Sequence, residues 1–235
     1  MTTLTTPPLS TLLVRLFADA EATQVTLRSE LAKLPPDERA ALMSSAQTDY
    51  RAFYGRAKDL HLAVSPATAS LLYLLARSTR ARAIVEFGTS FGISTLHLAA
   101  ALRDNGGGHL VGSEFEPAKV AGARENLAAA GLSDLVDIRE GDALETLARD
   151  LPTPIDLVLL DGAKVLYPKV LALLEPHLRD GALIVADNAD ASPEYLARVR
   201  SVGNGYVSVP FAEDVELVDA DRRGGGEGVS GAVGC

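Results

Sequence analysis

The chain has 235 residues, of which 47% are hydrophobic and 23% are charged, a composition that can bury one sizeable core. Its 22 basic and 31 acidic residues give a formal net charge of -9 at pH 7, which argues against nucleic acid as a partner. The only cysteine is Cys235, so the sequence excludes an internal disulfide framework and any cysteine-based metal cluster.

Residues 1–58 are expected to form an N-terminal helical segment. From Leu9 to about Tyr54 the apolar residues recur at helical spacing, and the pair Pro35-Pro36 interrupts the pattern before an acidic first turn. The chain start lacks a basic run before a long apolar stretch, and nowhere do about 18 apolar residues follow one another. We therefore expect a cytoplasmic protein with no membrane partner.

Residues 59–222 are expected to form one α/β core. Three short apolar runs, 83–87, 109–114 and 136–140, are each followed by a segment of helical pattern, the third of which covers 143–151. The runs 155–160 and 182–186 have almost no polar interruption, which is typical of central parallel strands covered on both faces.

The end of this core has a different pattern. Residues 206–210 and 215–219 predict a closing antiparallel hairpin, and the glycine-rich stretch 223–235 predicts a flexible tail. The fold class is therefore α/β: a doubly wound, Rossmann-like, mostly parallel seven-stranded sheet with a C-terminal antiparallel hairpin and N-terminal helices.

The segment EFGTSFGIST predicts a ligand-binding turn between a strand and a helix. Gly88 and Gly92 let the backbone turn tightly and approach a ligand before the helix begins near Ser94. The next strand ends in Glu114, where an α/β nucleotide fold places a carboxylate on ribose hydroxyls, and the third strand ends at Asp142. A dinucleotide site would need G-x-G-x-x-G. The spacing favours S-adenosylmethionine over NAD, although an ordinary loop would also explain the turn taken alone.

Oxygen-bearing side chains follow the next two strands. Asp161 ends the run 155–160, and Asp187 with Asn188 ends the run 182–186. Ligands of open α/β sheets bind at such strand ends, and these oxygens suit Mg²⁺ or a similar divalent cation. The alternative is an ordinary turn, since Asp and Asn both favour turns.

Taken in order, the segments EFGTSFGIST, SEFEP, GDALETL, LLDGAK and VADN resemble the class I S-adenosylmethionine-dependent O-methyltransferases, within them the cation-dependent catechol and caffeoyl-CoA type. The resemblance implies that residues 59–222 move the methyl group of S-adenosylmethionine to a hydroxyl of a small, hydroxylated aromatic acceptor, leaving S-adenosylhomocysteine. It implies cofactor contacts at Val64, Glu86, Gly88, Ser90, Ser94, Glu114, Phe115, Asp142, Ala143 and Asp161, and metal ligands at Asp161, Asp187 and Asn188.

The resemblance also implies that Lys164 is the general base that removes the acceptor's hydroxyl proton. This role needs a lowered pKa, which burial beside a cation would provide. Many bacterial and plant members resemble D-A-D-K where this chain has DGAK, so Ala163 replaces an acid and the acceptor's identity stays open. Because relatives of this type often pair, a homodimer is expected. His61 precedes the segment expected to pass the site; it either contacts substrate or, as we favour, is a surface or packing residue.

Three other functions are compatible with the sequence. The first is a metal-independent methyltransferase acting on another hydroxyl or a carboxyl group. The second is a non-catalytic adenosyl-binding module, although retention of Lys164 with all three expected metal ligands argues against it. The third, and the least favoured, is a nicotinamide oxidoreductase.

Overall fold

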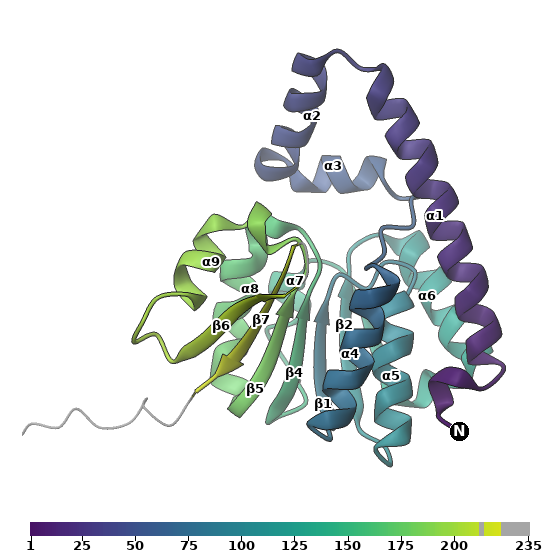
Figure 1. The fold of residues 1–235 in the computed structure, drawn as a ribbon, viewed down its shortest axis with the longest axis vertical. Helices are drawn as coiled ribbons and strands as arrows, with labels where there is room; N and C mark the ends of the chain where they lie inside the picture. The colour runs from purple at the N-terminus through teal and green to yellow at the C-terminus, as the bar shows by residue number, and fades with distance from the viewer. Residues whose placement is uncertain (212–213, 222–235) are drawn as a thin grey trace, which may run out of the picture.

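The structure is a computed structural model that describes residues 1–211 and 214–221, apart from the side chains of residues 43, 46 and 47. The strands are β1 (Ala83–Phe87), β2 (His109–Glu114), β3 (Val136–Glu140), β4 (Ile155–Leu160), β5 (Leu178–Ala186), β6 (Tyr206–Phe211) and β7 (Val215–Ala220). They form one sheet in the order β3-β2-β1-β4-β5-β7-β6, in which β7 runs antiparallel to both β5 and β6 and the other pairs are parallel (Figure 1). The predicted fold class is confirmed.

Helices cover both faces of the sheet. The α-helices are α1 (Leu9–Lys33), α2 (Pro36–Thr48), α3 (Tyr50–Arg56), α4 (Pro66–Ser78), α5 (Ile93–Asp104), α6 (Pro117–Ala130), α7 (Ala143–Thr146), α8 (Tyr167–Leu174) and α9 (Pro193–Val199). Short 3₁₀ turns are η1 (Thr3–Thr5), η2 (Ser133–Leu135), η3 (Lys164–Leu166), η4 (Glu175–His177) and η5 (Ala189–Ala191).

Alternation along the strands produces two hydrophobic clusters. Successive strand residues point to opposite faces, so Ile84 packs with α1, α4, α5 and α6 whereas Val85 packs with α7, α8 and α9. Leu157 and Val158 of β4 divide in the same way, and all four side chains are fully buried. The uninterrupted apolar runs of the sequence therefore reflect a sheet that is covered on both faces.

The helix expected over residues 143–151 is much shorter in the structure. Helix α7 ends at Thr146, and Asp150 has a left-handed backbone with φ of 50°. The guanidinium of Arg139 donates hydrogen bonds to the carbonyl oxygens of Thr146, Arg149 and Asp150 at 2.6–2.8 Å. Arg139 satisfies these carbonyls in place of helical amide groups, so the helix does not need to continue. The prediction of a helix over the second half of residues 143–151 was wrong.

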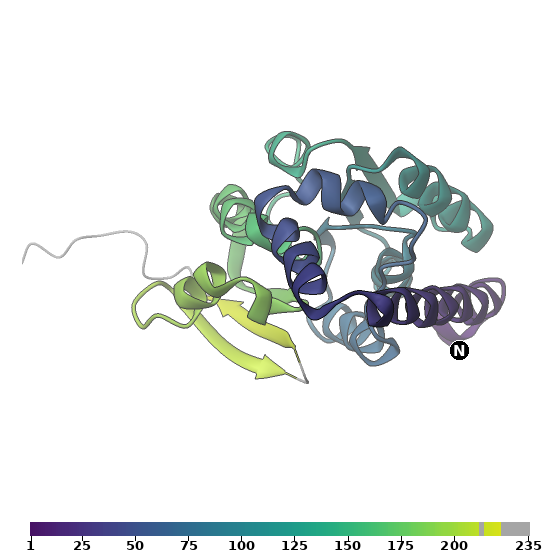
Figure 2. The ribbon, with the colours of Figure 1, turned by 90° about the horizontal axis from the view of Figure 1, so that it is seen from above.

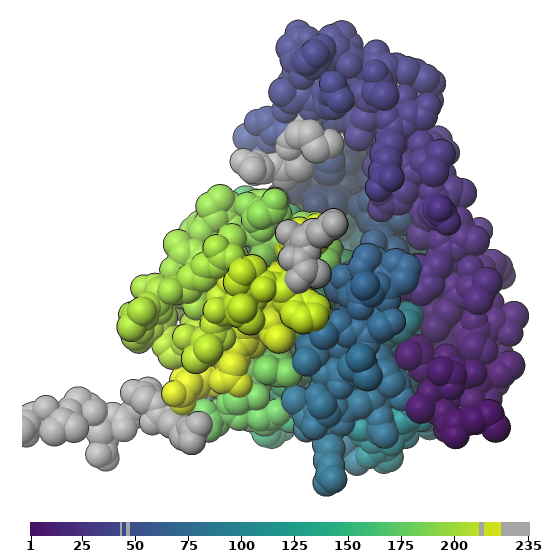
Figure 3. All heavy atoms as spheres, viewed as in Figure 1, coloured from purple at the N-terminus to yellow at the C-terminus, as the bar shows by residue number. Residues whose placement is uncertain are grey.

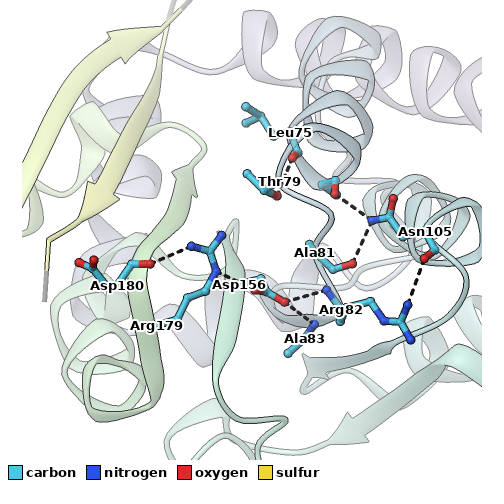
Figure 4. A network of polar contacts seen from close by, with 10 residues as sticks. Leu75, Thr79, Ala81, Arg82, Ala83, Asn105, Asp156, Arg179 and Asp180 are labelled. Carbon is cyan, nitrogen blue, oxygen red and sulfur yellow. Dashed lines mark hydrogen bonds and ion pairs between the residues drawn. The ribbon is translucent and has the colours of Figure 1, made fainter.

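Polar contacts fix the end of the sheet where β1 and β4 begin. The Asp156 carboxylate accepts hydrogen bonds from the backbone amides of Arg82 and Ala83, at 2.7 and 3.0 Å, and pairs with Arg179 (Figure 4). Asn105 donates from its side-chain amide to the carbonyl of Ala81 at 3.0 Å, which ties the end of α5 to the entry of β1. This polar end of the sheet is opposite to the end that carries the glycine turn, so its role is structural.

The N-terminal helices lie along one side of the core and over the ends of the strands. The first half of α1 packs into the same hydrophobic cluster as α5 and α6, while α2 and α3 cross above the sheet (Figures 1 and 2). Pro36 begins α2 and two acids follow in its first turn, as expected from the Pro-Pro break. The space-filling view shows these helices covering the upper end of the molecule (Figure 3).

The boundary at residue 58 stays a prediction, and the predicted tail, residues 223–235, lies outside the described part of the chain. Across residues 1–211 and 214–221, no helix has both the length and the apolar character that a membrane crossing requires.

Candidate active site

Backbone hydrogen bonds beyond the strand ends align the predicted site residues. The amide of Asp161 donates to the carbonyl of Phe87 at 2.8 Å, and that of Asp187 donates to the carbonyl of Leu160 at 2.9 Å. The residues that follow β1, β4 and β5 therefore lie next to one another. The order of strands reverses between β1 and β4, and open α/β sheets bind ligands at this point.

Gly88 is required at this reversal point. Its φ is +99°, and a Cβ atom there would lie 2.6 Å from the backbone of both Asp161 and Gly162. A side chain would collide with a neighbouring strand end and not with a movable group. The close approach of the two turns thus explains the first glycine of the motif.

A cavity of about 380 Å³ opens at these strand ends. The predicted residues that line it are Gly88, Ser90, Glu114, Phe115, Asp142, Ala143 and Asp161. Helix α3 closes it from above with Tyr50, Arg51 and Tyr54, and Arg51 pairs with Asp142 across its mouth. Of the other predicted cofactor residues, Ser94 lines a smaller adjoining cavity, whereas Val64 and Glu86 are buried outside both linings.

Glu114 is held in place by the backbone and keeps capacity for a ligand. One of its carboxylate oxygens accepts from the amide of Ser90 at 2.8 Å, and the other accepts from the amide of Glu116 at 3.0 Å. A carboxylate has about four lone-pair sites, so both oxygens remain able to accept from a pair of hydroxyls in the cavity. This geometry fits the ribose of an adenosyl cofactor.

Glu86 has a structural role below the glycine turn. It is fully buried and accepts hydrogen bonds from the hydroxyls of Ser94, Thr95 and Thr89 at 2.6, 2.5 and 3.1 Å. Burial raises its pKa to about 7, although the three hydroxyl donors partly oppose this shift. Through its hydrogen bond to Glu86, Ser94 therefore links the start of α5 to β1, on either side of the glycine turn.

Replacing Glu86 with glutamine is expected to change how stability depends on pH. A carboxyl with a folded pKa of about 7 and an ordinary value of 4.5 binds more protons in the folded state, so its charge lowers the free energy of unfolding as pH rises between these values. The Glu86→Gln variant should gain up to about 3 kcal/mol relative to the parent between pH 4.5 and 8. Urea unfolding at both pH values tests this; a constant difference between the variants would show that folding does not raise the pKa of Glu86.

Lys164 lies beside Asp161, as the sequence predicts. Its Nζ is 3.0 Å from Asp161 Oδ1 and 2.9 Å from the hydroxyl of Tyr167, which in turn lies 2.7 Å from the carbonyl of Leu160. Burial by itself lowers the pKa of Lys164, but Tyr167 and Asp161 outweigh it and raise the pKa above its ordinary value. The expected lowering is thus not found in the protein without a cation.

Asp187 and Asn188 complete the predicted metal set, and their chemistry fits a divalent cation. Burial raises the pKa of both Asp161 and Asp187, and the charge of Asp161 raises the pKa of Asp187 further. A divalent cation would remove this cost, and hard oxygen ligands suit Mg²⁺. Asn188 has a left-handed φ of 49° and donates from Nδ2 to Asp214, which leaves its amide oxygen as a further ligand.

The structure does not by itself establish this metal site. In the described ranges, no three His, Cys, Asp or Glu side chains are placed to hold an ion; the predicted set has two carboxyl groups and one amide. Lys164, Asp187 and Asn188 also lie outside the cavity lining, although Lys164 contacts the lining residue Asp161.

Several residues of the site were not predicted from the sequence. Tyr50, Arg51 and Tyr54 of α3 are distant in sequence from most of the strand ends, and no local pattern links them to the cavity. Lys119 also lines the cavity, although its side chain is buried in the first turn of α6. Tyr167 could have been suspected only from its place three residues after Lys164.

Three similarities with known proteins agree with this geometry. Residues 85–189 match the family described as "Methyltransferase domain". A catechol O-methyltransferase of Niastella koreensis is 38% identical over 130 residues, which cover 54% of this chain and 58% of that protein. The crystal structure of the O-methyltransferase TomG from Streptomyces achromogenes with SAM has a TM-score of 0.59 and 29% identity, covering 77% of this chain and 89% of that chain.

The chain therefore spans little more than half of its catechol relative. A longer match is found with a Mycobacterium bovis protein named "Putative O-methyltransferase", which is 35% identical over 165 residues, 69% of this chain and 67% of that protein. Because this similarity extends over two thirds of the relative, and the cofactor complex shares the fold that forms the Glu114 cavity, the chain belongs to the class I S-adenosylmethionine-dependent O-methyltransferases.

Proposed function

We propose that this protein transfers the methyl group of S-adenosylmethionine to a hydroxyl of a small catechol-like acceptor and requires a divalent cation, with Mg²⁺ as the expected ion. The observation that carries the proposal is the placement of Lys164 Nζ 3.0 Å from Asp161, at the strand end shared by the Glu114 cavity and the Asp187-Asn188 pair. The name of the Niastella koreensis relative supports a catechol as acceptor.

Bound S-adenosylmethionine supplies an electrophilic methyl group on a sulfonium. The chain's residues hold and enclose the cofactor: Glu114 accepts from the ribose hydroxyls, and the turn at Gly88 lets the ligand approach the backbone. Tyr50 and Tyr54 of α3 cover the cavity and exclude water. Positioning and water exclusion are the main contributions expected from a protein in a methyl transfer.

Asp161, Asp187 and Asn188 would hold the cation, which when bound acts as a Lewis acid and lowers the pKa of an acceptor hydroxyl. Lys164 takes the hydroxyl proton at Nζ, so that the acceptor oxygen can attack the methyl carbon while the carbon–sulfur bond breaks. Tyr167 positions Lys164 for this step, since its hydroxyl contacts Nζ and two backbone carbonyls. Lys164 must lose its own proton first. A cation that neutralised the charge of Asp161 would remove one cause of the raised pKa of Lys164.

The acceptor class is tested by methyl transfer from labelled S-adenosylmethionine to 3,4-dihydroxybenzoate, with 3-hydroxybenzoate and 4-hydroxybenzoate as matched controls. We expect labelled product from the diol only, because only vicinal hydroxyls present two oxygens to one cation. Equal turnover of the monohydroxy compounds would contradict the proposal and favour a metal-independent enzyme.

Tight binding of S-adenosylhomocysteine without turnover of any acceptor would favour the non-catalytic alternative. A nicotinamide enzyme would be recognised by a change in NADH fluorescence on mixing. The cytoplasmic location and the homodimer also stay predictions.

A further inference from the structure

The turn between β6 and β7 brings a further carboxylate, that of Asp214, to the end of β5. Strand β7 runs antiparallel to β5, and their register sets Ala186 opposite Glu216 (Figure 1). Continuing this register by two residues on each strand places Asn188 opposite Asp214. The hairpin that closes the sheet therefore adds an acid beside the expected metal ligands.

Asp214 contacts the end of β5 at two points. Its carboxylate accepts a hydrogen bond from Nδ2 of Asn188, and its backbone carbonyl accepts from the amide of Ala189 at 2.9 Å. Asn188 itself has a left-handed backbone with φ of 49°, which asparagine tolerates better than most residues. The backbone contact thus secures the turn, whereas the side-chain contact acts on the amide of Asn188 alone.

The side-chain contact selects one of two orientations of the Asn188 amide. An amide has an oxygen that accepts and a nitrogen that donates, and its two ends have nearly the same shape. A carboxylate has no proton to donate, so Asp214 can pair only with the nitrogen. The oxygen then lies at the other end of the amide, and oxygen is the atom that a hard divalent cation binds.

The charge of Asp214 is a second way in which this residue could affect the site. Burial is the main cause of the raised pKa of Asp161 and of Asp187, and the charge of Asp214 adds to it in both. Asp214 is exposed, however, and solvent weakens the effect of an exposed charge. The hydrogen bond to Asn188 is direct, so the orientation of the amide is the stronger basis for a role.

We propose that Asp214 is a positioning residue for cation binding: by accepting from Nδ2 of Asn188, it turns the amide oxygen of Asn188 toward the cation site. Asp214 acts through Asn188 and does not itself contact the ion. The inference rests on the proposed function, since it needs a divalent cation at Asp161, Asp187 and Asn188.

Two substitutions and their combination test whether Asp214 acts through Asn188. Asp214→Ala removes the carboxylate but keeps the backbone carbonyl that accepts from Ala189. Asn188→Gly removes the amide at a left-handed φ that glycine adopts readily. The double variant completes a double-mutant cycle, which measures the coupling between the two residues. Asp190→Asn is the matched control, because it removes an exposed charge close to Asn188.

Calorimetric titration with Mg²⁺ measures cation affinity without turnover. Asp214→Ala should weaken binding about tenfold, since residues that orient metal ligands typically contribute about 10–100-fold to affinity. In the Asn188→Gly background the same substitution should change affinity by less than about twofold, because no amide is left to orient. Asp190→Asn should stay within about twofold of the parent protein.

Water proton relaxation at saturating Mn²⁺ gives a second readout, which a change of charge alone does not move. If the amide oxygen turns away in Asp214→Ala, a water molecule takes its place on the ion. The relaxation enhancement of the bound ion should therefore rise to the level found in Asn188→Gly. An enhancement equal to that of the parent protein would show that the amide oxygen is still bound, and the positioning role would be wrong.

Two affinity results would overturn the inference and leave the proposed function standing. Equal weakening by Asp214→Ala with and without the Asn188 amide would show that Asp214 acts by its charge. Unchanged affinity in Asp214→Ala would show that the amide of Asn188 is oriented without it. If the parent protein bound neither Mg²⁺ nor Mn²⁺, the cation requirement of the proposed function would fail together with this inference.

Discussion

Replacing Lys164 with methionine or with arginine is expected to lower kcat by about 10²–10⁴-fold, the usual contribution of a general base. Methionine removes the amine, and arginine keeps a positive charge that cannot be lost in a protein. Both variants should therefore fail if Lys164 must accept a proton. Single-turnover methyl transfer from labelled S-adenosylmethionine to a catechol measures the effect.

The raised pKa of Lys164 in the cation-free protein makes the arginine variant the sharper test. If Lys164 acted only as a fixed positive charge beside the reacting oxygen, arginine would retain more than about a tenth of the activity, and the base assignment would be wrong. Lys169→Met is the matched control, because Lys169 is exposed on α8 and should be silent. Affinity for S-adenosylhomocysteine should stay unchanged in all three variants, since Lys164 does not line the cavity.

Removing divalent cations with excess chelator is expected to abolish turnover, and Asp187→Ala should lower it by at least about 10²-fold at saturating Mg²⁺. Chelation removes the ion and Asp187→Ala removes one of its expected oxygen ligands, while the backbone contacts that hold Glu114 in place stay intact. Restoring activity with added Mg²⁺ completes the test. Asp190→Asn is the matched control, because Asp190 is an exposed carboxylate just beyond Asn188.

Cation binding by the same site should also depend on pH in a defined direction. Burial raises the pKa of Asp187, and the charge of Asp161 raises it further, so the cation-free pair keeps a proton closer to neutral pH than ordinary carboxyl groups would. A cation must displace that proton, so its affinity should fall as the pH is lowered from 8 to 6, with proton release visible by calorimetry in buffers of different ionisation enthalpy. Turnover that survives chelation, or affinity independent of pH, would refute the metal role of these residues.

Much of the fold could be read from local patterns because each strand is a short apolar run with its own boundaries. The five parallel strands, the terminal hairpin and the start of α5 near Ser94 all follow from residues within a few positions of one another. The helix after β3 could not be read in this way. Its length depends on Arg139, whose guanidinium binds three carbonyls of the segment and so replaces the helical partners.

The sequence by itself determined which residues stand at the carboxyl ends of the strands, because a polar residue that follows a buried apolar run lies where the strand leaves the core. That sufficed for Gly88, Glu114, Asp161, Asp187 and Asn188. Only the tertiary structure decided what surrounds them: the strand order that sets β4 beside β1, and the α3 side chains above the cavity. It also decided the protonation of Lys164, since burial and the approach of Tyr167 and Asp161 are properties of the folded chain that no spacing of residues encodes.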